Sequence, residues 1–238
     1  MNDSSTNAFF NRFSDKGKLL GNYSRITDEL SLANFSARDN GLCILLVHVP
    51  IRAWSYPNIM PIGEGYIASV AVMDGHRVEV LDLNAERVKP VDSEEALKKW
   101  MDKRLEDVIN KVRPDIIGFG GIITQYRTIK CAMSLCKKLS PSSTVVLGGG
   151  IASCAPKFML DRTEADVVVI EEGEATFSEL LVRIEKLIPL NGLRGIGYKD
   201  SEGSYINRPR TSIVKGVNGL DGIPWPLRSY WPLDDVYS

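Results

Sequence analysis

Three carboxylates, Glu171, Glu172 and Glu174, follow a short apolar run at residues 166–170. A pair of carboxylates can perform general acid and base catalysis when one of them is held in a dry site. A simpler explanation is that Glu174 lies in the first turn of the next helix, where the helix dipole stabilises a negative charge. The cluster alone therefore does not separate a catalytic site from an ordinary helix start.

Glycines close the apolar runs that precede this cluster. Gly120 and Gly121 follow the run at residues 115–119, and Gly148, Gly149 and Gly150 follow the run at residues 144–147. Glycine lets the backbone come close to a ligand and aim its amides at polar groups. The run at residues 166–170 is likewise followed by a glycine, Gly173. A single glycine pair would only indicate a tight turn, but three neighbouring strand ends of this kind predict one ligand-binding crevice.

Apolar runs alternate with helical patterns from residue 42 to residue 187. We expect strands at 42–49, 77–83, 115–119, 144–147 and 166–170, and helices at 61–73, 93–112, 125–139, 155–160 and 175–187. Asp92 or Ser93 is placed to cap the longest helix. Short, nearly all-apolar strands separated by helices indicate a parallel sheet covered on both faces. The predicted fold class is α/β, a doubly wound five-stranded parallel sheet of the Rossmann-like or flavodoxin-like kind, in the order 2-1-3-4-5.

The flanking segments differ in pattern from this core. Residues 1–40 are polar, with weak helical signals at 7–13 and 27–35, and are expected to form an N-terminal arm. Residues 195–199 and 204–207 flank a turn and predict a hairpin. Proline-rich sequence from Arg208 onward indicates an extended linker. The expected domains are an arm at 1–40, a Rossmann-like domain at 41–190, and a hairpin with linker at 191–238.

Composition excludes several classes of protein. The 238 residues carry a net charge of −1, with 44% hydrophobic and 25% charged residues, so neither nucleic acid nor an anionic membrane surface is an expected partner. No apolar run is long enough to cross a bilayer, and the N-terminus does not resemble a secretory signal, so we expect a cytoplasmic location. The four cysteines form no Cys-x-x-Cys pair. Reduced, mostly buried thiols are expected, and no zinc or iron–sulfur site within this chain.

Several short motifs follow one another in an order that resembles a known family. They are Pro61-Ile62-Gly63, Gly75-His76, Gly118-Phe119-Gly120-Gly121, Gly148-Gly149, Glu172-Gly173-Glu174-x-Thr176-Phe177, Asn207-Arg208-Pro209 and Asp221-Gly222-Ile223-Pro224. The set resembles the N-terminal cobalamin (B12)-binding domain of B12-dependent radical S-adenosylmethionine (radical SAM) enzymes, over roughly residues 41–237. Each motif is weak by itself, and their ordered combination carries the resemblance.

The resemblance implies that cobalamin binds at the carboxyl edge of the sheet, with its nucleotide tail between the third and fourth strands. Glycines would keep that slot clear of side chains. Glu171 departs from the family, which usually has a basic or small residue there. The cofactor-binding residues that the resemblance implies are Gly120, Gly121, Ile122, Thr124, Gly148, Gly149, Gly150, Ile151, Glu172, Gly173 and Glu174.

No histidine is expected to ligate the cobalt. The segment Asp74-x-His76-x-x-Glu79 resembles the histidine loop of other cobalamin proteins, but it precedes the second strand, at the opposite edge of the sheet, and Glu79 replaces a glycine. We interpret it as a helix-to-strand turn. His48 lies within the first strand and is expected to be a satisfied core residue. Arg52, Trp54 and Tyr56 could cover the corrin ring or simply anchor their loop.

The sequence lacks the Cys-x-x-x-Cys-x-x-Cys motif that holds the cluster of a radical SAM enzyme. We therefore expect S-adenosylmethionine and a 4Fe-4S cluster only in a further C-terminal domain, the partner across the linker. The sequence would then be part of a methyltransferase or ring-forming enzyme, and whether this chain is itself an enzyme stays open. The alternatives are a stand-alone cobalamin carrier or sensor, or a degenerate, non-catalytic interaction domain. A nicotinamide-binding domain would need Gly-x-Gly-x-x-Gly after the first strand, and a response regulator would need an Asp ending the third.

Overall fold

The computed structural model of the protein describes residues 41–51, 59–86, 93–210, 223–231 and 237. Seven strands form one sheet in the order β2-β1-β3-β4-β5-β6-β7. The parallel strands are β1 (Cys43–His48), β2 (Arg77–Asp82), β3 (Ile116–Phe119), β4 (Thr144–Leu147) and β5 (Val167–Val169). Their order confirms the predicted doubly wound topology, with β1 inside the parallel part of the sheet.

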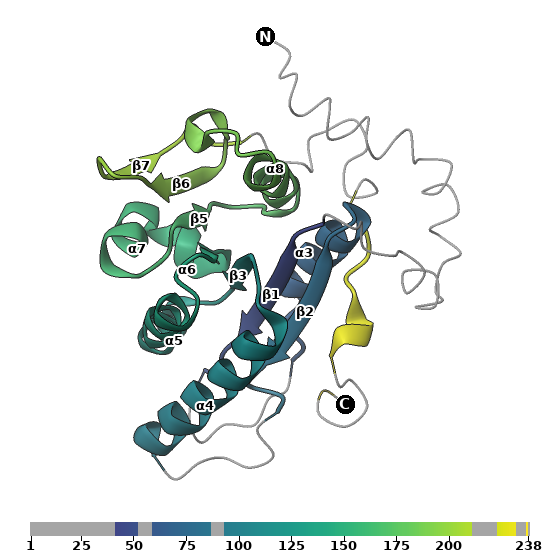
Figure 1. The fold of residues 1–238 in the computed structure, drawn as a ribbon, viewed down its shortest axis with the longest axis vertical. Helices are drawn as coiled ribbons and strands as arrows, with labels where there is room; N and C mark the ends of the chain where they lie inside the picture. Colours follow the sequence, from purple (N-terminus) through teal and green to yellow (C-terminus); the bar gives the residue numbers. More distant parts are fainter. Residues whose placement is uncertain (1–40, 52–58, 87–92, 211–222, 232–236, 238) are drawn as a thin grey trace.

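Helices cover both faces of this sheet (Figure 1). They are α3 (Ile62–Met73), α4 (Glu94–Val112), α5 (Tyr126–Leu139), α6 (Gly149–Cys154), α7 (Pro156–Arg162) and α8 (Glu174–Glu185). One buried cluster joins α3 and α8 to one face, and a second joins α4, α5 and α7 to the other. Strands covered on both sides must be apolar throughout, which is why β1, β3 and β5 have almost no polar residues.

Local signals explain several of these boundaries. Ser93 caps α4 by accepting a hydrogen bond from the Ala96 amide at 3.1 Å. The same helix ends at Arg113, which adopts a left-handed conformation with φ of 50°. Between α3 and β2, Gly75 and His76 form the predicted turn, and the His76 Nδ1 accepts a hydrogen bond from the Leu42 amide at 3.1 Å.

The region after β4 differs from the prediction of one short helix at 155–160. Helix α6 begins directly at Gly149, and α7 follows after Ala155, because Pro156 suits the first turn of a new helix but cannot continue an old one. The glycine pair therefore belongs to a helix start rather than to an open loop.

The predicted hairpin is part of the main sheet. Strands β6 (Ile196–Lys199) and β7 (Ser204–Ile206) extend the sheet in antiparallel fashion beyond β5. Tyr198 and Tyr205 stack across this pair with ring centroids 5.4 Å apart. Strand β5 would otherwise present an unpaired backbone edge, which the hairpin covers.

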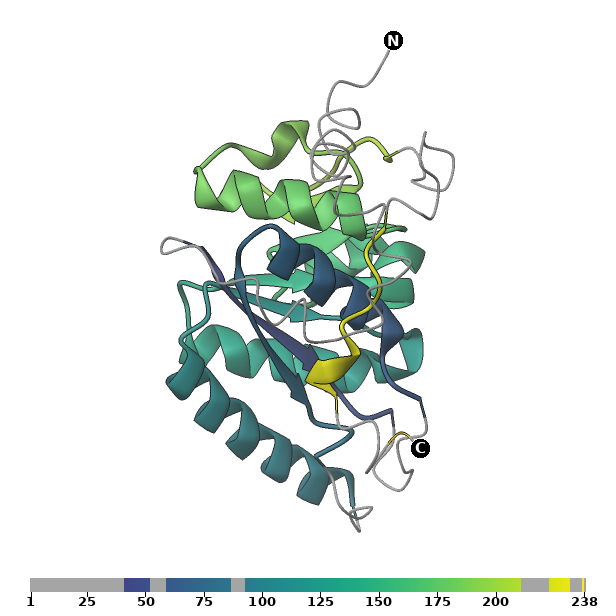
Figure 2. The ribbon, with the colours of Figure 1, turned by 90° about the vertical axis from the view of Figure 1, so that its right-hand side faces the viewer.

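Residues 223–231 pack along the outer side of α3, where Figure 2 shows them in yellow. The Leu227 amide donates to the Gly65 carbonyl at 3.1 Å, and the Ser69 hydroxyl donates to the Trp225 carbonyl at 2.5 Å. The side chains of Leu227 and Trp231 are buried in the core on that face. This part of the expected linker is therefore held by the domain. The short 3-10 turn η7 (Arg228–Tyr230) lies within it, and η4 (Leu190–Gly192) precedes β6.

The expectation that the cysteines are mostly buried is half wrong. All four are free thiols, but Cys131 and Cys154 are exposed on the surfaces of helices, whereas Cys43 and Cys136 are buried. Both exposed cysteines lie on the outward side of amphipathic elements, which composition alone does not reveal. The expected helices at 7–13 and 27–35 lie outside the described residues. None of the described helices is long and apolar enough to cross a membrane.

Candidate functional site

A cavity of about 220 Å³ opens at the carboxyl ends of β1, β3, β4 and β5, on the face that α3 and α8 cover. Its walls come from all six of these elements. The lining residues are Leu46, Gly63, Glu64, Ile67, Gly118, Phe119, Gly120, Gly121, Val146, Gly148, Gly149, Val169, Glu171, Glu172, Gly173, Glu174 and Phe177. The cavity lies where an open α/β sheet binds its ligands.

The floor of the cavity is apolar. Leu46, Val146 and Val169 come from β1, β4 and β5, and Phe177 from α8 closes one side. Gly118 lies between these strands, where an added Cβ would be 2.8 Å from the Leu46 side chain. The absence of a side chain at Gly118 therefore leaves a flat, deep floor under the crevice.

The loops after β3 and β4 are locked together through their backbones. The Ile151 amide donates to the Gly121 carbonyl at 3.1 Å, and the Gly148 amide donates to the Phe119 carbonyl at 2.8 Å. Gly149 has a φ of 77°, and a Cβ there would lie 2.9 Å from the Gly121 carbonyl oxygen. Glycine is thus required at position 149 by the protein's own backbone, whatever ligand binds nearby.

The side chain of Gln125 links the loop after β3 to the residue that follows β1. Its side-chain amide donates to the Val49 carbonyl at 2.6 Å, and its oxygen accepts from the Ile122 amide at 3.0 Å. Gln125 is buried and belongs to the 3-10 turn η3 (Ile123–Gln125) that precedes α5. The two strand ends that frame the cavity are therefore held rigidly relative to one another.

Glu64, in the first turn of α3, brings a carboxylate to the cavity wall. Its Oε1 lies 3.0 Å from the His48 Nδ1 at the end of β1. Burial lowers the pKa of His48, but the hydrogen bond and charge of Glu64, with a smaller contribution from Asp82, outweigh it and raise the pKa above 6.5. The pair is therefore a partly buried, charge-assisted contact beside the site.

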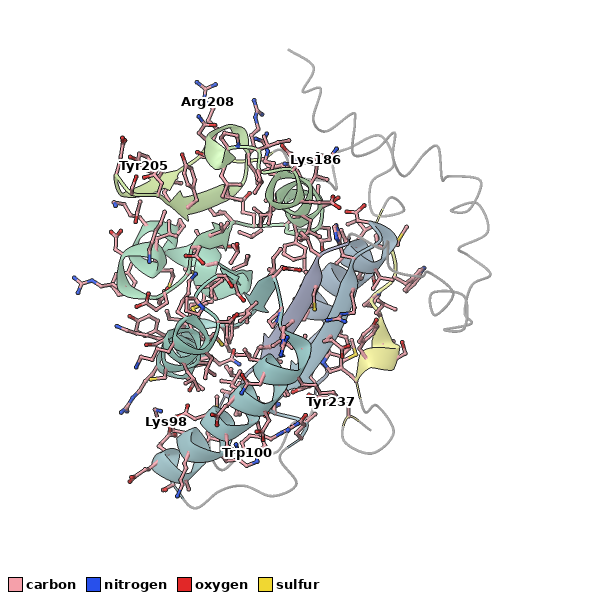
Figure 3. All side chains as sticks on the ribbon, viewed as in Figure 1. Lys98, Trp100, Lys186, Tyr205, Arg208 and Tyr237 are labelled. Carbon is pink, nitrogen blue, oxygen red and sulfur yellow. The ribbon has the colours of Figure 1, made fainter. Side chains whose placement is uncertain are left out.

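Asp82, whose charge acts on His48, also forms a hydrogen bond with a residue from the C-terminal part of the chain. Its Oδ1 accepts hydrogen bonds from the amides of Asn84 and Ala85 at 3.0 and 2.9 Å. Its Oδ2 accepts from the hydroxyl of Tyr237, a side chain labelled in Figure 3. Burial and the bond to Asp82 together raise the pKa of Tyr237, so the phenol is neutral and acts as the donor. A residue near the C-terminus of the chain is thus tied to the carboxyl edge of the sheet.

The segment between β5 and α8 forms the opposite wall. Glu171 has a left-handed backbone with φ of 63°, and Gly173 approaches α3 so closely that a Cβ would lie 3.1 Å from the Ile67 side chain. Glu174 begins α8 and faces the cavity, where its Oε2 is buried without a hydrogen-bond partner. Burial, together with the nearby charge of Glu172, raises the pKa of Glu174.

The sequence-predicted site residues separate into two groups. Gly120, Gly121, Gly148, Gly149, Glu172, Gly173 and Glu174 line the cavity together. The other four do not line it, since Ile151 is fully buried in the core while Ile122, Thr124 and Gly150 are exposed at the rim side of their loops. Thr124 belongs to η3 and both Gly150 and Ile151 to α6, so helical geometry sets the direction of each of them.

Sequence reasoning missed the contributions of Glu64, Gln125 and Gly118. Glu64 lies one residue beyond the motif Pro61-Ile62-Gly63, and its acidic position in a first helical turn could have marked it. Gln125 gave no signal, because its role depends on contact with a residue far away in the chain. Gly118 lies inside a strand, a position that often marks a close approach.

Neither histidine is placed as a free metal ligand. His76 is buried at the opposite edge of the sheet, and the ring of His48 is held by Glu64. Among the residues that the structure describes, no group of three or more His, Cys, Asp or Glu could hold a metal ion. Arg52, Trp54 and Tyr56 lie outside the described ranges.

The size of the cavity limits what can enter it. An apolar cavity of about 150 Å³ accepts benzene, whereas sites for whole drug-sized ligands measure roughly 300–1,000 Å³. At about 220 Å³, this cavity suits a flat fused ring rather than a complete large cofactor. A ligand of that kind would insert one ring and leave its remaining bulk above the carboxyl edge.

Comparison with protein families agrees with this arrangement. A model of the B12 binding domain family matches residues 50–181, more than half of the chain. The chain belongs to this family. The matched range runs from the end of β1 into α8 and includes every element that lines the cavity except β1 itself.

Curated relatives are methyltransferases and a synthase. The chain is 27% identical over 201 residues to the cytidylyl-2-hydroxyethylphosphonate methyltransferase of Streptomyces wedmorensis, covering 75% of this chain and 38% of that protein. It is 29% identical over 175 residues to an uncharacterized methyltransferase of Pyrococcus horikoshii, covering 73% and 34%. It is 23% identical over 173 residues to the 4'-phospho-dehydrooxetanocin synthase of Priestia megaterium, covering 67% and 23%. The chain thus spans well under half the length of these relatives.

Solved structures share the fold. The radical S-adenosylmethionine methyltransferase TsrM from Kitasatospora setae, with cobalamin and a 4Fe-4S cluster bound, matches with a TM-score of 0.60 at 20% identity, over 78% of this chain and 31% of that one. The cobalamin-dependent S-adenosylmethionine radical enzyme OxsB, with aqua-cobalamin and S-adenosylmethionine bound, matches with a TM-score of 0.60 at 21% identity, over 80% and 25%. At these identities the likeness describes the fold alone.

Proposed function

We propose that this chain is the cobalamin-binding domain of a B12-dependent radical SAM enzyme. The observation that carries the proposal is the glycine-walled, apolar cavity at the carboxyl edge of a sheet that belongs to the B12 binding domain family. Its size suits the base of the nucleotide tail. The corrin ring would lie above the edge, against the loops that follow β1, β3 and β4.

The chain's own residues have three tasks in this proposal. The locked loops at Gly121 and Gly149 keep the entrance to the slot open, and Leu46, Val146 and Phe177 exclude water from it. When bound, cobalamin supplies a cobalt centre that can carry a methyl group. The protein positions the group and shields it, while the cofactor provides the difficult chemistry.

The lower face of the cobalt has no histidine ligand in this proposal. The Nδ1 of His48 is engaged by Glu64, and the His48 side chain retains only 14% of its exposure. His76 lies at the far edge of the sheet, where it accepts a hydrogen bond from the Leu42 amide. A buried, paired imidazole and one on the wrong edge both support an unligated lower face.

The domain plan follows from the same proposal. In this plan residues 41–190 would be the cobalamin-binding domain, and 191–238 would be the hairpin that pairs with its sheet and the connection towards a radical SAM domain. The arm expected at 1–40 lies outside the described residues. S-adenosylmethionine and the 4Fe-4S cluster would bind in that partner domain, since this sequence lacks the cysteine motif for the cluster. The relatives that are methyltransferases favour methyl transfer, and the synthase keeps ring-forming chemistry as the second candidate.

Reconstitution with cobalamin tests the proposal. The purified chain is mixed with hydroxocobalamin, freed of unbound cofactor by gel filtration, and examined by absorbance. We expect close to one cobalamin per chain, with a spectrum showing that the tail base has left the cobalt. A chain that retains no cobalamin would instead support the degenerate interaction domain. Retention in a protein whose full reading frame lacks a radical SAM domain would support a carrier or sensor.

A further inference from the structure

Glu174 presents an unpaired carboxyl oxygen to an otherwise apolar cavity. Its Oε2 is buried and accepts no hydrogen bond, while Phe177 one turn later in α8 and Val169 at the end of β5 supply apolar surface to the same cavity. A buried polar atom without a partner destabilises the folded protein, so such atoms are rare. An unpaired atom that faces a cavity indicates that a ligand supplies the partner.

The surroundings show what that partner must bring. Among the described residues that line the cavity, none is a lysine or arginine. The other ionisable residues that line the cavity are acidic: Glu172, Glu171 and Glu64. His48, the hydrogen-bond partner of Glu64, is the nearby basic group. The lining of β1, β3, β4 and β5 contributes no charged group. Burial raises the pKa of Glu174, and with the charge of Glu172 it outweighs a backbone hydrogen bond that lowers it, so the net shift is towards the protonated carboxyl.

The tail base of cobalamin has the matching chemistry. Benzimidazole is a flat, mostly apolar fused ring, and the ring nitrogen that can bind cobalt becomes a free hydrogen-bond acceptor once the base leaves the metal. Inside an apolar slot that nitrogen needs a donor. A protonated carboxyl at Glu174 is such a donor. If the proton lies on the ring nitrogen instead, the ring donates to the carboxylate of Glu174, and the two atoms form the same contact.

We propose that Glu174 is the specificity-determining residue for the lower base, sharing one proton with the ring nitrogen of the base inside the cavity. The inference rests on the proposed function, and it identifies the benzimidazole base of the nucleotide tail as the part of cobalamin that the cavity binds. The contact needs one proton between the two atoms, so it weakens once the pH is high enough to remove that proton from both partners. The shared proton also holds the base away from the cobalt, which is consistent with a lower face that has no nitrogen ligand.

Two corrinoids separate this contact from the rest of the site. Cobalamin carries the nucleotide tail, whereas cobinamide has the same corrin ring and cobalt but lacks the tail. The dissociation constants of both are measured by absorbance titration for the full chain and for Glu174→Ala and Glu174→Gln. Glutamine keeps a donor of similar shape, and Glu185→Gln, at the other end of α8, is the matched control.

We expect Glu174→Ala to weaken cobalamin about tenfold or more, as the loss of a buried hydrogen bond predicts, and to leave cobinamide within about twofold. Glu174→Gln should bind cobalamin within about threefold of the wild type, because its amide donates to the ring nitrogen. Cobalamin affinity of the wild type should fall as pH rises above neutrality, and that of Glu174→Gln should not. Circular dichroism of each variant checks that it is folded.

The outcomes distinguish two failures. If the wild-type chain binds neither corrinoid, the proposed function itself fails. If it binds cobalamin but Glu174→Ala binds it equally well, or loses cobalamin and cobinamide to the same extent, cobalamin binding stands and the role of Glu174 is overturned. A pH dependence that persists unchanged in Glu174→Gln would also overturn it.

Discussion

The carboxylate of Glu64 occupies the space that a side chain at Gly120 would fill. A Cβ built on Gly120 would lie 2.7 Å from the Glu64 Oε1 and 2.9 Å from its Cδ. The same oxygen contacts His48 at 3.0 Å, so the end of β1, the first turn of α3 and the end of β3 meet at one point. The glycine of the β3 motif thus accommodates a neighbouring acidic side chain as well as any ligand.

Gly149 and Gly120 should respond differently to alanine. At Gly149 the φ of 77° and the contact with the Gly121 backbone leave no room to adjust, so Gly149→Ala should destabilise the fold by about 1–3 kcal/mol. At Gly120 the obstructing atoms are the flexible end of Glu64, so Gly120→Ala should change stability by less than about 1 kcal/mol. Denaturant unfolding of both variants measures the difference.

The larger change Gly149→Leu should abolish cobalamin binding, because it separates the two loops that frame the slot. Equal destabilisation by the two alanine variants, or unchanged cobalamin affinity in Gly149→Leu, would show that the backbone contact with Gly121 does not set the geometry of the slot.

The contact between His48 and Glu64 should make stability depend on pH. Because the folded pKa of His48 is raised above 6.5, its contribution is fully present below that unfolded value and is lost as pH rises through the folded pKa. Thermal unfolding of the wild type across that window should show a decline that is absent in His48→Gln. A decline of the same size in His48→Gln would assign it to other groups.

The lower face of bound cobalt should show no histidine signature. Electron paramagnetic resonance of the Co(II) state should lack the nitrogen splitting that a coordinated imidazole produces, because the ring of His48 is paired and that of His76 lies at the opposite edge. His76→Ala should leave the spectrum unchanged. Nitrogen splitting that disappears in His76→Ala or His48→Gln would refute the unligated face.

Leu227 should contribute to folding although it lies in the proline-rich C-terminal stretch. Its side chain is buried against α3, so Leu227→Ala should cost about 2–5 kcal/mol of unfolding free energy. Trp225→Ala is the matched control, since that side chain is 68% exposed and its removal should change stability by less than about 0.5 kcal/mol. Equal, small effects in both variants would mean that residues 223–231 are only loosely attached.

Much of the fold could be predicted from local patterns. The strands are uniformly apolar and the helices between them carry clear signals, such as the cap at Ser93, so the parallel strand order followed from the right-handed crossover rule. The antiparallel pairing of β6 with β5 was not predicted. It depends on the free backbone edge that β5 offers in the folded sheet, which local sequence does not reveal. The expected helix at 155–160 corresponds to α7, whereas α6 was missed, because its first two residues are glycines.

The parts of the candidate site that are formed by the backbone at glycines could be predicted from the sequence. The parts that depend on contacts between residues far apart in the chain could not. Glycines at strand ends located the cavity, since their meaning is local. The roles of Glu64 and Gln125 come from partners in other elements, His48 and Val49, and the unpaired state of Glu174 is visible only when its neighbours are known. The side chain of Ile151 lies in the core because α6 begins at Gly149, and that helix start was not predicted from the sequence.

A crystal structure of the cobalamin-loaded chain tests the central claim most directly. The account predicts that the detached tail base lies in the cavity between α3 and α8, on the floor formed by Leu46 and Val146, with a ring nitrogen within hydrogen-bond distance of Glu174. It further predicts no imidazole on the cobalt. A base that remains on the cobalt, or that lies outside this cavity, would contradict the account.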